Sequence, residues 1–283
     1  MYYNTLLKVE PHIEVSGKKM SSSKTGIEWT DKTWNPTTGC TKVSPGCRHC
    51  YAEAITMRFP GSFPTGFNFT IHPERLEQPK KWRTPSRIFV NSMSDLFHED
   101  LDFGYLQEIF AVMRDTPWHI YQILTKRPQK LATLADKLEW SENIWMGVSV
   151  ESQQYTHRIE ALKTVPAKVR FLSCEPLLGP LNLDLSLIDW VIVGGESGYQ
   201  HRPIEPDWVR EILAQTRESK VAFFFKQWGG NYSKAGGRML DERIWDEMPA
   251  AWNEHNAKWT IRAGSSLKKL SKSKEQNNLL TLT

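Results

Sequence analysis

The chain contains little cysteine, and it has no apolar run of the length that a secretory leader or a membrane span requires. Only four of its 283 residues are cysteine. Without a leader or a span, the sequence predicts a cytoplasmic protein that has no membrane contact and whose thiols stay reduced. Disulfides are therefore not expected, and cysteines that are grouped along the chain are expected to bind metal or to carry out redox chemistry.

Two further absences narrow the fold class. The chain has no internal repeat of short period, which argues against a solenoid. The glycine run at residues 194–198 lacks the spacing of a dinucleotide-binding fingerprint. A tight turn from a strand into a helix is the better interpretation of that run, with Glu196 facing a pocket. The length of 283 residues and the hydrophobic content of 40% are ample for one large core.

The basic excess is confined to the two ends of the chain. Of the formal net charge of +4, residues 264–283 contribute +3 and residues 1–20 contribute +1, so the part between them is near neutral. This argues against a strongly basic nucleic-acid-binding face on the fold. From composition we expect a disordered extension at residues 1–25, in which Met20 resembles an ordinary protein start, a folded domain at residues 26–263, and a disordered basic tail at residues 264–283.

Short β-rich runs alternate with amphipathic helical runs. Eight strands are predicted, at Thr33–Thr37, Asn68–His72, Arg87–Asn91, His119–Leu124, Ile144–Val148, Lys168–Ser173, Asp189–Val193 and Val221–Phe225. Their mostly continuous apolar character is typical of strands that are buried on both faces of a parallel sheet. Helices with one apolar face are expected after Asp100 or Asp102, near Pro128, near Tyr155 and at Pro206. The fold class is therefore α/β, and the pattern predicts a TIM-like (βα) barrel, complete or partial, in a single domain.

Three of the four cysteines, Cys40, Cys47 and Cys50, lie in one loop directly before a predicted helix at Tyr51–Phe59. A structural zinc site needs four ligands, whereas a 4Fe-4S cluster held by three cysteines keeps one iron open for a substrate or cofactor. Cys50 lies where the helix begins, and the unpaired amides there favour thiolates and the anionic cluster that they hold. The three cysteines therefore point to a catalytic metal centre.

Zinc is the alternative, with His49, His98 or Cys174 as the fourth ligand. A thioredoxin-like Cys-x-x-Cys motif fits less well, because it leaves Cys40 unused.

Polar residues follow most of the predicted strands. In parallel βα folds the reactive face lies at the carboxyl ends of the strands. The polar groups are Asn91, Ser92 and Asp95 after the third strand, Thr125, Lys126 and Arg127 after the fourth, Ser149 and Glu151 after the fifth, Cys174 and Glu175 after the sixth, Glu196 after the seventh, and Lys226 after the eighth. We expect them to converge on one pocket, with the cysteine loop at its rim.

The chain resembles the radical S-adenosylmethionine (radical SAM) superfamily, in particular its phage-associated three-cysteine-motif branch of unassigned function. The resemblance covers roughly residues 26–250, from Ile27–Thr30 and Trp34–Pro36 through the cysteines to Trp245–Pro249. The stretch from Leu124 to Pro176 also resembles spore photoproduct lyases, which repair DNA. The resemblance implies a 4Fe-4S cluster on Cys40, Cys47 and Cys50 that reductively cleaves S-adenosylmethionine. The resulting 5′-deoxyadenosyl radical abstracts a hydrogen atom from the substrate.

The resemblance also implies roles for particular residues. His49 would lie beside the adenine, and Thr125, Lys126 and Arg127 would hold the carboxylate of S-adenosylmethionine. Ser149 and Glu151 are candidates for the ribose hydroxyls. Asn91 and Ser92 are further cofactor-binding candidates, and Cys174, Glu175 and Glu196 are the catalytic candidates.

The substrate follows less directly. The likeness to a repair lyase favours a nucleic-acid base that is taken out of its stack for modification or repair. An external electron donor is implied, and a partner protein that delivers the substrate is a further expectation.

Several alternatives stay open. Cys174 is either a small core residue, or a hydrogen-atom donor, or a fourth metal ligand. The acidic run at residues 95–100 is either a second metal site or, more simply, helix capping. Two contrasting functions are a zinc-binding phage or defence module without enzymatic activity, and a metal-dependent hydrolase built from Asp95, His98 and Glu196.

Overall fold

The computed structural model describes residues 25–232 and 234–259. The predicted tail at residues 264–283, and all of the predicted extension except residue 25, lie outside the described residues. No helix in these ranges is both long enough and apolar enough to cross a membrane.

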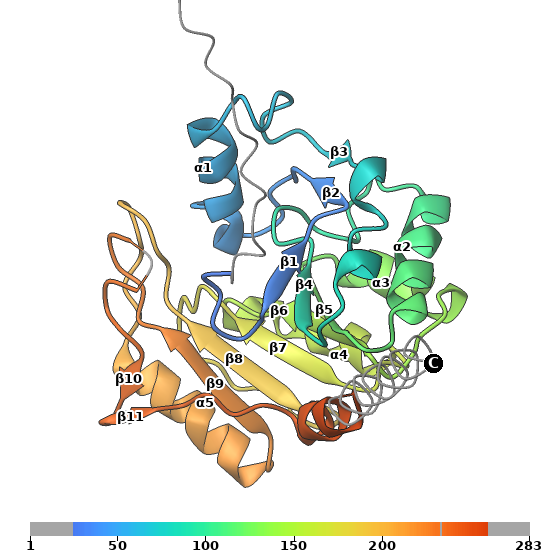
Figure 1. The fold of residues 1–283 in the computed structure, drawn as a ribbon. Helices are drawn as coiled ribbons and strands as arrows, with labels where there is room; N and C mark the ends of the chain where they lie inside the picture. The colour runs from blue at the N-terminus through green and yellow to red at the C-terminus, as the bar shows by residue number, and fades with distance from the viewer. Residues whose placement is uncertain (1–24, 233, 260–283) are drawn as a thin grey trace, which may run out of the picture.

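A curled sheet of seven parallel strands forms the centre of the fold (Figure 1). In spatial order the strands are β1 (Lys32–Trp34), β4 (Arg87–Val90), β5 (Ile120–Thr125), β6 (Ile144–Ser149), β7 (Arg170–Cys174), β8 (Trp190–Gly194) and β9 (Ala222–Gln227). Every neighbouring pair is parallel. Among the described residues β1 and β9 are the two edges and do not pair with each other. The barrel is therefore partial, one of the two forms that the sequence predicts.

Two of the eight predicted strands do not form as expected. The run at Thr33–Thr37 is divided into β1 and the short β2 (Thr37–Thr38), because Pro36 has no amide hydrogen to donate to the ladder. The run at Asn68–His72 forms β3 (Thr70–Ile71), which pairs antiparallel with β2 instead of joining the main sheet. The short β10 (Met239–Leu240) and β11 (Arg243–Ile244) form a separate antiparallel pair.

Helices cover the outer face of the sheet. They are α2 (Phe103–Asp115), α3 (Pro128–Leu134), α4 (His157–Lys163) and α5 (Pro206–Glu218), while α1 (Tyr51–Arg58) follows the cysteine loop and stands apart from them in Figure 1. Single 3-10 turns occur at Pro45–Cys47, Pro73–Arg75, Pro79–Lys81, Ala135–Lys137 and Gln153–Tyr155. Asp102 caps α2 by accepting the Tyr105 amide hydrogen, and Pro128 and Pro206 lie in the first turns of α3 and α5, as predicted.

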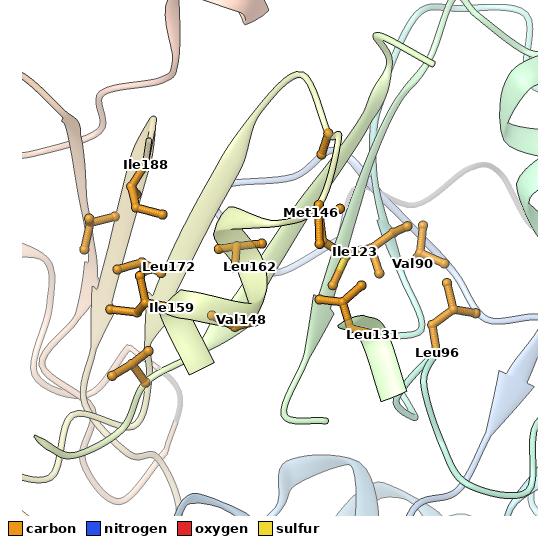
Figure 2. Packing of buried hydrophobic residues seen from close by; sticks show 14 of the residues in the cluster. Val90, Leu96, Ile123, Leu131, Met146, Val148, Ile159, Leu162, Leu172 and Ile188 are labelled. Carbon is orange, nitrogen blue, oxygen red and sulfur yellow. The ribbon is translucent and has the colours of Figure 1, made fainter. Parts of the chain in front are cut away.

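The two faces of the sheet carry different cores. On the outer face, aliphatic side chains such as Val148, Leu172 and Ile123 pack against Leu131 of α3 and Ile159 of α4 (Figure 2). The inner face carries a second cluster that is rich in aromatic rings. Its buried members are Trp29, Phe89, Ile120, Trp145, Val169, Phe171, Trp190, Ile192 and Phe224. These rings fill the lower part of the half-barrel, towards the amino ends of the strands. Within the half-barrel, a functional site can therefore lie only at the upper end, at the carboxyl ends of the strands.

Residues near the C-terminus close the lower end of the sheet. Residues 250–259 are helical, and Trp252 lies against the Arg87 guanidinium at the start of β4, 4.9 Å from ring centroid to Cζ. The indole of Trp190 donates to Glu247 O at 2.8 Å, and Phe225 N–H of the edge strand β9 donates to Trp245 O at 2.8 Å. These contacts cover the exposed edge and leave the carboxyl ends of the strands as the accessible end.

Because side chains alternate along a strand, the position of each inner aromatic residue fixes the face of the residues that follow it. Ser149 shares the inner face with Trp145, Lys126 shares it with the inward-facing Leu124, and Lys226 shares it with Phe224. The polar residues that end β5, β6 and β9 therefore form the upper layer of the half-barrel.

Candidate active site

The cysteine loop, residues 39–50, is fixed at its start by Gly39. This residue has a φ of +78°, and its N–H donates to Met93 O at 2.9 Å. A Cβ at this position would lie only 2.0 Å from the backbone oxygen of Asn68. Glycine is therefore required for the close approach of three chain segments. The next residue, Cys40, donates its N–H to Phe67 O at 3.1 Å, so the first cysteine is held by the backbone itself.

Of the other two cysteines, Cys47 ends a tight turn at Pro45–Cys47, and Cys50 follows it. Cys50 is the N-cap residue of α1, which confirms the predicted position of this thiol at the start of the helix. Its backbone is extended, at φ −66° and ψ 121°. The first amides of α1 therefore lie next to Cys50, where they favour a thiolate.

All four cysteines are free thiols, and the three in the loop are half-buried. Burial and, after it, the Asp95 carboxylate raise the pKa of Cys40 to about 11, although the Arg127 guanidinium opposes both effects. Arg127 Nη1 lies 3.5 Å from Cys40 Sγ. The Lys42 ammonium lies near the other two cysteines. Its pKa is raised, first by the hydrogen bond to Glu53 and then by the charges of Cys50 and Cys47. Both cations compensate negative charge on the sulfurs.

Within residues 25–232 and 234–259, no group of three or more His, Cys, Asp or Glu side chains is arranged around a single metal ion. The alternative zinc site and the alternative second metal site at residues 95–100 therefore gain no support from the geometry. A 4Fe-4S cluster is larger than one ion, and its cysteine ligands are correspondingly farther apart. Three free, half-buried thiols in one loop, flanked by two cations, fit such a cluster in number, in chemistry and in charge.

Asp95 and Arg127 form a buried ion pair in the site. Arg127 Nη1 lies 3.1 Å from Asp95 Oδ2, and both side chains are less than a tenth exposed. Asp95 also accepts hydrogen bonds from Thr125 Oγ1 at 2.7 Å and from the Lys126 N–H at 3.0 Å. Arg127 Nη2 donates to the backbone and side-chain oxygens of Thr41. The pair thus ties the end of β5 to the cysteine loop.

His98 takes no part in a metal site here. Its ring stacks on Phe69 at a centroid distance of 4.4 Å, and its nitrogens bond Thr41 Oγ1 and the Asp100 amide. Asp95 is held by Arg127, and Glu196 is held by Arg202. The alternative of a hydrolase site made of Asp95, His98 and Glu196 is therefore not assembled among the described residues.

Lys126 and Ser149 meet on the inner face. Lys126 Nζ donates to Ser149 Oγ at 3.0 Å, which brings together two residues predicted for the carboxylate and the ribose of the cofactor. Thr125 points to the outer face and acts through Asp95 and the Arg127 amide. It is therefore a positioning residue for its two neighbours.

Glu151 is completely buried beneath the cysteine loop. Its Oε2 pairs with Arg158 Nη1 at 2.8 Å, and its Oε1 has no hydrogen-bond partner among the described residues. A Cβ placed on Gly46 would lie 3.0 Å from Glu151 Cγ, so the loop passes directly over this carboxylate. A buried acceptor without a donor is costly. Glu151 Oε1 is therefore available to a hydroxyl or amino group that enters under the loop.

His49 contacts Glu196 across the mouth of the site. His49 Nδ1 lies 3.1 Å from Glu196 Oε2, and Arg202 donates its backbone N–H to Oε2 and its Nη2 to Oε1 of the same carboxylate. Burial would raise the pKa of Glu196, but the hydrogen bonds from Arg202 and His49 hold it at about 2. Glu196 is therefore ionised, and it fixes the ring of the residue that precedes Cys50.

Asn91 and Ser92 hold the backbone that faces the cysteines. Asn91 has a φ of +57°, which asparagine tolerates better than most residues, and its side chain bonds Thr37. Ser92 Oγ donates to Asn35 Oδ1 at 3.2 Å, and the Tyr51 hydroxyl donates to Ser92 O. Both residues position the strand end rather than present free polar groups.

Cys174 lies on the outer face of the sheet, away from Lys126 and Ser149. It has no exposed surface, it packs with Leu172 in the helix-facing cluster, and burial raises its pKa strongly. This placement favours the core interpretation that the sequence left open, and it separates Cys174 from the cysteine loop. Glu175, the next residue, forms an ion pair with Lys226 Nζ at 2.6 Å.

Three cations complete the site, and sequence reasoning missed two of them, Arg158 and Arg202. Arg202, Arg158 and Lys226 each pair with a predicted carboxylate, at Glu196, Glu151 and Glu175 respectively. Lys226 was predicted from its position at a strand end. Arg158 and Arg202 lie in or before helices, where an arginine gives no signal that it faces a site.

A family model described as "Protein of unknown function (DUF5131)" matches residues 24–249. No curated protein matches the sequence. Among solved structures, spore photoproduct lyase complexed with a dinucleoside spore photoproduct has 15% sequence identity and a TM-score of 0.44, covering 72% of this chain and 65% of that one. A mutant of that lyase has 17% identity and a TM-score of 0.43, covering 73% and 65%. A double mutant with bound AdoMet has 15% identity and a TM-score of 0.43, covering 70% and 63%. The matched region thus spans less than two thirds of these lyases.

Proposed function

We propose a function for this chain, which belongs to the DUF5131 family of proteins of unknown function, from the chemistry of its cysteine loop. The protein is a radical SAM enzyme in which Cys40, Cys47 and Cys50 hold a 4Fe-4S cluster. When bound, the cluster and S-adenosylmethionine together supply an adenosyl radical that abstracts a hydrogen atom from the substrate. The observation that carries the proposal is a loop with three free, half-buried thiols and no fourth cysteine within reach, since Cys174 is packed on the outer face.

The number of ligands decides between a closed and an open metal site. A closed zinc site would need a fourth ligand, but His49 is engaged with Glu196 and His98 is stacked on Phe69. Three thiolates instead leave one iron without a protein ligand. That open position is where a cofactor with amino and carboxylate groups can bind.

The cations around the loop prepare it for an anionic cluster. Cys40, with its pKa raised to about 11, is protonated at neutral pH when no metal is bound. Metal binding must therefore release that proton, and Arg127 at 3.5 Å then compensates the thiolate. Arg127 itself is held in place by Asp95, so its position does not depend on the cluster.

The inner layer supplies donors and acceptors that match the remaining parts of S-adenosylmethionine. Lys126, which bonds Ser149, provides a cation for the carboxylate. Glu151 Oε1 provides a buried acceptor for a ribose hydroxyl beneath the loop. His49, whose ring is fixed by Glu196, provides a flat surface beside the adenine. Each role uses an atom that is oriented by a second residue.

The ion pair of Glu175 and Lys226 belongs, in this proposal, to the substrate side of the site. Both residues follow or end strands at the accessible end, and both are partly exposed. The substrate that we propose is a nucleic-acid base, because a flat heterocycle offers the hydrogen-bonding edge that a carboxylate and an ammonium group can read. An external electron donor is required to reduce the cluster.

The test is release of 5′-deoxyadenosine. The protein would be purified without oxygen, reconstituted with iron and sulfide, and assayed with S-adenosylmethionine and a chemical reductant, beside Cys47→Ala. We expect turnover that disappears in the variant. Cys174→Ala serves as a matched control for loss of a cysteine and should retain turnover. A colourless protein with one tightly bound zinc and no deoxyadenosine would instead favour a zinc-binding module.

A further inference from the structure

A cavity of about 600 Å³ lies outside the half-barrel, between α3 and the start of α4 and beside the cysteine loop. It is separate from the inner face, although Lys126 and Arg127 border both. Its lining consists of Val43, Glu99, Lys126, Arg127, Pro128, Gln129, Lys130, Thr133, Leu134, Tyr155, His157 and Arg158. This volume is in the range of small-ligand sites.

The lining is strongly biased in charge. It contains four Lys or Arg residues and only one carboxylate, that of Glu99. The bias is local, because the chain outside its two ends is near neutral. Arg127 and Arg158 are paired with Asp95 and Glu151, respectively. Within the part of the chain that the structure describes, Lys126 and Lys130 have no carboxylate partner. The lining carboxylate of Glu99 makes a second ion pair with Arg127 at 3.5 Å, so the cavity keeps an excess of one positive charge.

The two lysines differ in what they can offer. Lys130 Nζ is bonded by the carbonyls of His98, Glu99 and Leu101, so its three donors are used and it contributes charge alone. Lys126 Nζ donates to Ser149 Oγ, which leaves two donors, one for the carboxylate proposed above and one for a ligand in the cavity. Arg158 adds a guanidinium that lies over the Tyr155 ring, with Cζ 4.1 Å from the ring centroid. An ammonium and a planar guanidinium on one wall suit the oxygens of a phosphate.

We infer that this cavity binds the phosphate of a nucleotide or of a nucleic-acid strand and so holds a phosphate ester next to the cysteine loop. Val43 of the loop forms part of the wall, so a bound phosphate lies beside the proposed metal centre. The inference deepens the proposed function by naming phosphate as the recognised group. It rests on that function only for the reaction, because the binding itself needs neither cluster nor S-adenosylmethionine.

The experiment inserts negative charge into the cavity at two positions of α3, and the internal contact that Thr133→Glu removes is the hydrogen bond from Thr133 Oγ1 to Gln129 O at 2.9 Å. Gln129 and Thr133 are exposed residues of α3 that line the cavity. Gln129→Glu is close to isosteric, and acidic side chains are favourable in the first turn of a helix, so folding should be kept. Thr133→Glu replaces a poor helix former by a better one. Ala132→Glu is the matched control, because Ala132 is exposed on the same helix but does not line the cavity.

Binding is measured by fluorescence anisotropy with two labelled probes, adenosine 5′-monophosphate and a short oligothymidylate, on the unreconstituted protein. We expect one probe to bind, Gln129→Glu and Thr133→Glu to weaken its affinity by about tenfold or more, and Ala132→Glu to have little effect. Tighter binding of the oligonucleotide, with a slope of log affinity against log salt of about −0.7 for each phosphate contacted, identifies a strand as the source. Tighter binding of the monophosphate identifies a free nucleotide.

Two results would overturn the inference. One is that neither probe binds. The other is that all three variants weaken binding equally, which would show a diffuse surface field rather than a site. Neither result bears on deoxyadenosine release, so failure of the phosphate site and failure of the radical SAM assignment are distinguishable.

Discussion

Single residues in this site act through partners that are distant in the sequence. Arg127 contacts Cys40, which lies 87 positions earlier, and His49 contacts Glu196, which lies 147 positions later. The sequence placed Arg127 and Glu196 at strand ends, and it placed Cys40 and His49 in the loop. It could not pair them, because pairing depends on how the loop folds back over the sheet.

Arg127→Met is expected to lower the free energy of unfolding by about 3–5 kcal/mol, because Asp95 stays buried without a compensating charge. Urea denaturation of the unreconstituted protein measures the change. Replacing both partners, as in Asp95→Leu with Arg127→Met, should recover part of the loss. Additive losses in the double variant would mean that the two side chains do not act as a pair.

His119 is a second residue whose surroundings decide its behaviour. It is fully buried at the start of β5, and its Nε2 bonds the carbonyl oxygens of Pro79 and Trp82. Burial lowers its pKa to about 4, from an ordinary value of about 6.5. The folded state therefore binds a proton less readily than the unfolded state. The stabilisation from neutral His119 is complete above about pH 6.5 and is lost as the pH falls towards 4.

His119→Gln is expected to reduce this pH dependence. Glutamine can donate to the same carbonyls but does not titrate. The decrease in unfolding free energy between pH 7 and pH 4.5 should be smaller in the variant by on the order of 2 kcal/mol. Urea denaturation at the two pH values is the measurement, and an unchanged decrease would show that His119 is not the titrating group.

Secondary-structure elements were predictable where the hydrophobic pattern of the segment itself determines which face is buried. The continuous apolar runs of β4 to β9 gave these strands nearly their observed bounds, and the apolar stripes and first-turn residues of α2 and α5 gave the position where each helix begins. The run at Asn68–His72 looked like a further barrel strand. It pairs with β2 instead, because β1 pairs directly with β4 and no space remains between them. Strand order is a property of the assembled sheet, and a single run does not contain it.

Gly39→Ala tests how the loop and this small sheet are joined. The positive φ and the contact of 2.0 Å with Asn68 O predict a loss of unfolding free energy of at least about 2 kcal/mol and displacement of the cysteine loop. Urea denaturation and the iron bound after reconstitution measure the two effects.

Gly61→Ala is the matched control, since nothing lies within 4 Å of a Cβ at that position. It should change neither quantity. Equal iron content in Gly39→Ala and the native protein would mean that the loop does not depend on this anchor.

At the scale of the whole molecule, the half-barrel is covered at its lower end and carries polar residues at its upper end, where the strands have their carboxyl ends. Aromatic side chains fill the lower inner face, and the segment that includes Trp245, Glu247 and Trp252 covers the edge and the lower end. The cysteine loop, the inner cations and the outer cavity all lie around the upper end. The sequence predicted which end of the sheet is accessible, because the direction of the strands determines it. It did not predict the outer cavity, which forms only when α3 and α4 lie side by side.

The central claim is that three cysteines hold a 4Fe-4S cluster whose open iron binds S-adenosylmethionine. Electron paramagnetic resonance of the anaerobically reconstituted, reduced protein, with and without S-adenosylmethionine, tests it most directly. The account predicts the iron and sulfide of one 4Fe-4S cluster per chain and a spectrum that changes when S-adenosylmethionine is added, with no cluster signal in Cys47→Ala. A cluster whose spectrum is indifferent to S-adenosylmethionine, or a protein that binds no iron, would contradict it.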